Sequence, residues 1–156
     1  MNRTTTLRFA YLTTDEVNQD LALQMAEHCN ATLHVLSPQD APADGRFDAV
    51  LYDWDYLSRD QRSRVLAELR SGPLPCPVAL HSYHLEAATA NALRRRGVII
   101  CRRLELKVFR ALRRAVRQVQ ALAPPDGGPE QHRASEEHLF PRSEPGRGGP
   151  FLSPAK

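Results

Sequence analysis

Short apolar runs alternate with segments of helical pattern, and this alternation constrains the fold more than any other feature. The runs are almost continuously apolar, and they cover residues 7–12, 31–36, 47–52, 77–82 and 98–101. Helical patterns follow at residues 13–29, 58–70, 85–96 and 104–122. Continuously apolar strands belong to a parallel sheet that helices cover on both faces. The chain is therefore predicted to form a three-layer α/β/α sandwich around a five-stranded parallel sheet.

Local patterns predict where the helices begin and which side chains they bury. Thr13 with Glu16, and Ser58 with Gln61, each have the spacing of a capping box at a helix start. In the first helix the expected buried stripe is Val17, Leu21, Met25 and Cys29. In the last helix it is Phe109, Leu112, Val116 and Val119.

One crossover is too short for an ordinary helix. Only ten residues separate Leu36 from Phe47, and they include Pro38 and Pro42. A parallel crossover normally needs about a dozen residues or more. The second helix is therefore expected to be shortened or missing.

The composition changes after Leu122. The last 34 residues hold 7 of the 12 prolines and 5 of the 8 glycines, with few apolar side chains. Such a segment cannot offset the entropy of ordering by burying apolar surface. We expect a folded domain over residues 1–122 and a disordered Pro/Gly-rich tail over residues 123–156.

The net charge of +3 conceals a strongly basic stretch, residues 94–117, with ten basic side chains and one acid, Glu105. The basic residues are Arg94, Arg95, Arg96, Arg102, Arg103, Lys107, Arg110, Arg113, Arg114 and Arg117. Such an uneven distribution of charge indicates what kind of partner the protein binds rather than how it folds. No apolar run approaches a membrane span and the start has no signal-peptide pattern, so a soluble, cytoplasmic protein is expected.

Two strand-like segments carry a resemblance to a known family. The run 47–53 ends in Asp53, and the run 77–82 ends in Ser82. Together with these two runs, residues 7–121 resemble the receiver domain of bacterial response regulators, a flavodoxin-like fold. Residues 15–21 resemble the opening of the first helix in that family. The resemblance implies the strand order 2-1-3-4-5, with Asp53 at the phospho-acceptor position and Ser82 as a phosphoryl contact. A second interpretation stays open, in which Asp53 only caps a turn at a strand end.

The rest of the receiver site is altered. The acidic pair that holds Mg²⁺ in the family falls on Thr13 and Thr14, whose neutral hydroxyls are poor ligands for this ion. Only a register shifted by two would place Asp15 and Glu16 there, and only then is Mg²⁺ expected.

The lysine position after the fifth strand is also substituted. It falls on Leu104, or on Arg103 if one residue is deleted, and an arginine there could contact a phosphoryl group. The resemblance therefore implies a degenerate receiver, or pseudo-receiver, with no metal, no cofactor and no enzymatic activity.

Three functions stay open. The first is a signalling module that binds a protein with an acidic surface, such as a histidine kinase or another signalling protein. Its expected contacts, on one side of the last helix, are Lys107, Arg110, Arg114 and Arg117. The alternative is nucleic-acid binding through the basic 94–117 face, which would be sensitive to salt. The third, a small enzyme, is disfavoured because the first turn has no glycine to cradle a phosphate.

Overall fold

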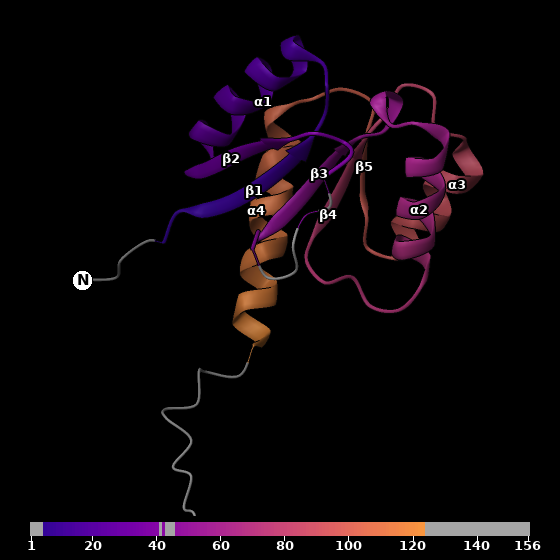
Figure 1. Ribbon diagram of the computed structural model, residues 1–156. Helices are drawn as coiled ribbons and strands as arrows, with labels where there is room; N and C mark the ends of the chain where they lie inside the picture. Colours follow the sequence, from indigo (N-terminus) through magenta and orange to yellow (C-terminus); the bar gives the residue numbers. More distant parts are fainter. Residues whose placement is uncertain (1–4, 41, 43–45, 124–156) are drawn as a thin grey trace, which may run out of the picture. The chain divides into compact units, whose positions relative to one another are not determined.

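A computed structural model describes residues 5–40, 42 and 46–123, all within the unit Met1–Pro124. Within these residues the strands form one parallel sheet with the order β2-β1-β3-β4-β5 (Figure 1). The strands are β1 (Leu7–Leu12), β2 (Ala31–Leu36), β3 (Ala49–Asp53), β4 (Val78–His81) and β5 (Ile99–Cys101). This is a three-layer α/β/α arrangement with the flavodoxin-like strand order, as the sequence predicts.

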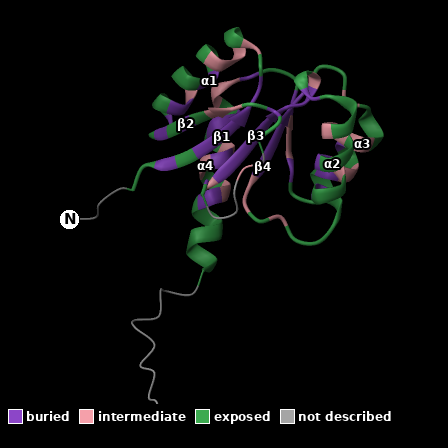
Figure 2. Cartoon of the chain, viewed as in Figure 1, coloured by how far each residue is buried: buried purple, intermediate pink, exposed green. Residues whose placement is uncertain are grey.

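Helices cover both faces of the sheet. They are α1 (Glu16–His28), α2 (Arg59–Arg70), α3 (Ala87–Arg95) and α4 (Leu106–Leu122), with a short 3₁₀ helix η1 (Trp54–Tyr56) after β3. On β1, Phe9 and Tyr11 pack with α1 and α4, while Ala10 and Leu12 pack with α2 and α3. The central strands are buried between these layers (Figure 2), which explains why their sequences are apolar at successive positions.

The short crossover between β2 and β3 behaves as expected. Its described residues, 37–40, 42 and 46–48, include turns and no helix. The sandwich therefore lacks a helix at this place, within the part of the chain that the structure describes. The predicted tail lies, from residue 124 onward, outside the described residues.

One predicted capping box is confirmed and the other is wrong. At α2, Ser58 Oγ accepts from the Gln61 amide at 3.2 Å, and Gln61 Oε1 accepts from the Ser58 amide at 2.7 Å. At α1 the N-cap is Asp15, whose carboxylate accepts from the Asn18 amide at 2.8 Å. The Thr13 hydroxyl accepts from the Asp15 amide at 3.0 Å, before the helix begins, and donates to a buried carboxylate that is described below.

The predicted buried stripe of α1 is confirmed only at its carboxyl end, where Cys29 is buried and Met25 is partly buried, and it is wrong at the start of the helix. Val17 is 75% exposed and Leu21 is exposed, whereas Ala22 and Ala26 face the sheet. The helix is rotated so that Asn18, at the start of the same face, reaches the carboxyl end of β3. Small alanines along this face let the helix pack closely on the strands.

The last helix continues past its core contacts. Val108, Phe109, Leu112 and Val116 are buried, but the expected core residue Val119 is 53% exposed. All side chains from residue 117 to 122 are exposed, and this end of α4 extends beyond the sheet (Figure 2). The buried stripe of α4 therefore stops at Val116, because no strand of the described residues lies beneath the last turns.

Candidate functional site

The carboxyl ends of three neighbouring strands bring the candidate site together. Asp53 is the last residue of β3 and is paired in register with His81 on β4. On the other side, β1 supplies Tyr11 and continues into Thr13. Both Asp53 and His81 are almost fully buried, with exposed fractions of 1% and 2%. The position expected for a phospho-acceptor is therefore an interior one.

The Asp53 carboxylate is surrounded by donors from four elements or loops. Its Oδ2 accepts from the Tyr11 hydroxyl at 3.2 Å, from the Thr13 hydroxyl at 2.7 Å and from Asn18 Nδ2 at 3.0 Å. Its Oδ1 lies 3.5 Å from Nδ1 of His81, a long contact rather than a formed hydrogen bond. A carboxylate oxygen offers about two lone-pair directions, so Oδ2 is fully occupied by protein donors.

These donors keep Asp53 in its ionised form. Burial alone would raise the pKa of Asp53, but the His81 contact and the hydrogen bonds from Thr13 and Asn18 outweigh it and lower the pKa below its ordinary value. The same carboxylate acts on its neighbour: burial and then the charge of Asp53 raise the pKa of Tyr11. Tyr11 therefore stays protonated and available as a donor.

His81 is the least satisfied member of the cluster. Within the described residues, neither of its ring nitrogens has a hydrogen-bond partner. Its ring meets that of Tyr83 edge to face, with the centroids 5.5 Å apart. His81 thus lies close enough to Asp53 to help lower its pKa, and its ring packs against that of Tyr83.

The two expected phosphoryl contacts are Ser82 and Arg103, and neither is hydrogen-bonded to Asp53. Ser82 is buried, but its hydroxyl donates to Oδ1 of Asp55 at 2.6 Å rather than to Asp53. Asp55 Oδ2 also accepts from the Tyr83 amide at 2.8 Å, which ties η1 to the loop after β4. Sequence reasoning singled out Asp53 and passed over Asp55 as a partner of Ser82; the spacing Asp53-x-Asp55 after an apolar strand was the available signal.

The positions expected for an acidic pair are neutral or already engaged. Thr14 is exposed, and Glu16 is exposed in the first turn of α1. Asp15, the alternative ligand, uses Oδ1 to cap α1 and accepts from the Tyr56 hydroxyl on Oδ2 at 2.5 Å. The described residues contain no group of three or more His, Cys, Asp or Glu side chains placed to hold a metal ion. The geometry thus offers no support for the shifted register.

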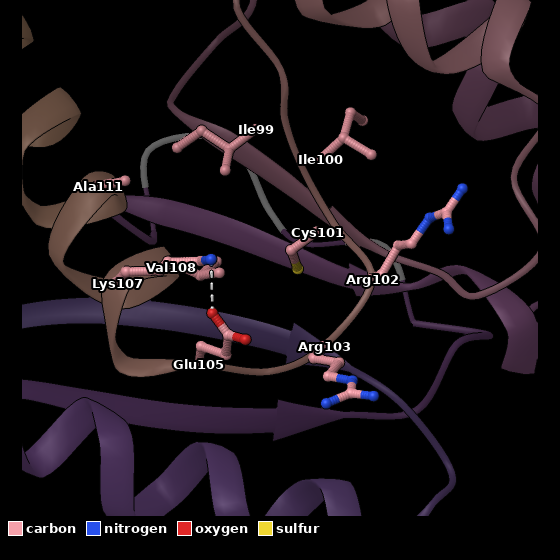
Figure 3. A pocket seen from close by; sticks show the side chains of 9 residues that line it. All are labelled: Ile99, Ile100, Cys101, Arg102, Arg103, Glu105, Lys107, Val108 and Ala111. Carbon is pink, nitrogen blue, oxygen red and sulfur yellow. Dashed lines mark ion pairs between the residues drawn. The ribbon is translucent and has the colours of Figure 1, made fainter.

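Arg103 belongs to a separate hollow beside β5. This hollow of about 470 Å³ has an apolar wall with three basic side chains around it (Figure 3). It is lined by Ile99, Ile100, Cys101, Arg102, Arg103, Glu105, Lys107, Val108 and Ala111. Lys107 Nζ pairs with Glu105 at 2.7 Å, so the expected partner-binding lysine already has a counter-ion. Burial raises the pKa of the Cys101 thiol to about 12, which leaves it protonated and not nucleophilic.

The arginines of α4 form a second, outward-facing hollow of about 530 Å³. It is lined by Arg110, Arg113, Arg114, Arg117, Gln118 and Ala121, and we call it the arginine groove. The structure thus keeps Arg110, Arg114 and Arg117 together but separates Lys107 from them. It adds Arg113, which belongs to the basic stretch 94–117 but was not among the expected binding residues. The signal for Arg113 was its helical spacing, three residues after Arg110 and four residues before Arg117.

The comparisons do not name a family. The chain matches no protein-family model, and no curated protein was found to match it. Among the described residues, every helix is too short or too polar to cross a membrane.

Proposed function

We propose that the chain is a receiver-like signalling module that works by binding a protein partner and not by phosphorylation of Asp53. The observation that carries this proposal is the set of donors around Asp53. Its Oδ2 is saturated by Tyr11, Thr13 and Asn18, and the side chain is 1% exposed.

A carboxylate in that setting is poorly suited to phosphoryl transfer. Attack on phosphorus needs an accessible oxygen lone pair and a cation to neutralise the charge that gathers on the phosphoryl oxygens. Here hydroxyl and amide donors fill the lone pairs of Oδ2, and Thr13, at a position where the receiver family has an acid, is one of these donors. Asp53 instead has a structural role, since its hydrogen bonds tie the end of β3 to the end of β1 and the start of α1.

The arginine groove supports protein binding. Its four guanidinium groups have no ion-pair partner within the described residues, and guanidinium forks match carboxylates. A partner with an acidic surface would supply the missing charges. Nucleic acid is the weaker occupant because, among the residues that the structure describes, no aromatic ring lines the groove for stacking on bases.

The test is covalent labelling. The full chain is incubated with Mg²⁺ and a small acyl-phosphate donor, and its intact mass is followed beside that of the Asp53→Asn variant. The proposal predicts that neither protein gains a phosphoryl group in stoichiometric amount. Rapid, complete labelling of the wild type that the variant lacks would overturn it.

A further inference from the structure

The arginine groove has a regular spacing along α4. Its guanidinium side chains come from positions 110, 113, 114 and 117, which follow the i, i+3, i+4, i+7 pattern of one helix face. From Arg110 to Arg117 the helix rises about 10.5 Å. The basic charge is thus arranged as a short stripe parallel to the helix axis.

This stripe lies away from the core contacts of α4. The buried residues of the helix are Val108, Phe109, Leu112 and Val116, and none of them lines the groove. Arg110 and Arg114 are exposed, and Gln118 and Ala121 continue the groove along the end that extends beyond the sheet. A partner can therefore approach the groove along its whole length without displacing any core side chain.

We infer that the arginine groove binds an acidic α-helix of a partner protein, with carboxylates at positions i, i+4 and i+7 on one face. This inference rests on the proposed function and names its partner. Carboxylates at that spacing on a second helix repeat at the same interval as the arginines, so each meets a guanidinium when the two axes run alongside. The short Ala121 side chain leaves room for the partner's backbone at the end of the groove.

Other occupants fit less well. A second copy of this chain would bring the same unpaired arginines face to face, which is repulsive in a two-fold contact. The chain's own segment 124–156 carries five acidic and four basic side chains, so its net charge does not complement the groove. A nucleic-acid strand would find the cations but no ring to stack on.

Two synthetic peptides of identical composition provide the probe. Both are helical, but one carries three glutamates at i, i+4 and i+7 on one face, and the other distributes them around the helix. Binding to the full chain is measured by fluorescence anisotropy, with a single-stranded oligonucleotide as competitor. Three proteins are compared: the wild type, the double variant Arg114→Gln/Arg117→Gln, and the control Arg59→Gln/Arg64→Gln. The control removes the same charge from exposed arginines of α2, which covers the other face of the sheet.

The wild type is expected to bind the one-faced peptide more tightly than the distributed one. The groove variant should bind it about fivefold more weakly, as for the loss of two exposed ion pairs, while the control stays within twofold. The inference is overturned if both peptides bind equally, if neither binds, if the two variants weaken binding alike, or if the oligonucleotide displaces the peptide at much lower concentration. These results are independent of labelling at Asp53, so the failure of this inference and the failure of the proposed function can be told apart.

Discussion

The hydroxyl of Thr13 donates a 2.7 Å hydrogen bond to Oδ2 of Asp53, across forty residues of sequence. Thr13 stands just after β1, and Asp53 ends β3, so this bond fastens the carboxyl ends of two paired strands. Because both side chains are buried, the bond is shielded from water and made to a charged acceptor. The same bond occupies one of the two carboxylate oxygens of Asp53.

Replacing Thr13 by valine tests the strength of this bond. Thr13→Val keeps the shape but removes a donor from a buried carboxylate, so we expect a loss of about 1.5–3 kcal/mol in the free energy of unfolding. Urea denaturation measures it, with Thr14→Val as the control because Thr14 is exposed next to it. Equal, small changes in both variants would show that the Thr13–Asp53 bond does not stabilise the fold.

The ionised state of Asp53 gives the stability a specific dependence on pH. The pKa of Asp53 is lower in the folded chain than its ordinary value of 3.8, so the charge stabilises the fold above that value. This contribution disappears as the pH falls through the folded pKa, below 3.8. In Asp53→Asn the free energy of unfolding should fall less steeply as the pH is lowered. Unfolding experiments at a series of acidic pH values measure this. Parallel stability curves for the two proteins would contradict this role.

The Tyr56–Asp15 bond is expected to set the acidity of the helix cap. The Tyr56 hydroxyl and the Asn18 amide both lower the pKa of Asp15, with the hydroxyl as the larger cause. In Tyr56→Phe the pKa of Asp15 should rise toward its ordinary value, while the Asn18 amide stays bonded to the cap. A carbon NMR titration of the Asp15 carboxyl group measures this change. An unaltered titration curve would mean that the hydroxyl does not reach Asp15 in solution.

Two leucines of α4 test how far its packing extends. Leu112 is fully buried, whereas Leu122 is 86% exposed on the end that extends beyond the sheet. Leu112→Ala should cost about 2–5 kcal/mol of unfolding free energy, and Leu122→Ala less than about 0.5 kcal/mol. Thermal or urea unfolding of the pair gives both values in one experiment. A large effect at Leu122 would mean that the end of α4 is covered.

The sheet could be predicted because its signal is local and strong. Apolar runs such as 7–12 and 31–36 reappear as strands with the same bounds, since a strand buried on both faces has few alternatives. Which face of α1 is buried could not be predicted in this way. Its most apolar stripe, from Val17 to Leu21, is exposed because Asn18 turns toward Asp53, a tertiary contact that helical periodicity does not encode.

The candidate site was predicted in part. Position Asp53 at a strand end followed from the pattern, but the partners of its carboxylate depend on three strands meeting at one edge. Ser82 was expected as a phosphoryl contact, and its bond to Asp55, which lies in η1, could not be read from the sequence pattern. The charge of α4 was readable from the sequence, whereas the division between Lys107 and the arginine groove required the position of β5.

The state of the Asp53 carboxyl group in solution tests the central claim most directly. Its side-chain carbon is followed by NMR through an acid titration, with and without Mg²⁺, in the full chain. We expect a carboxyl group that titrates below the ordinary 3.8 and, if the proposed function holds, does not shift when Mg²⁺ is added. A carboxyl group that titrates at or above 3.8, or that shifts saturably with Mg²⁺, would contradict the account of Asp53 as a structural anion held by Tyr11, Thr13 and Asn18.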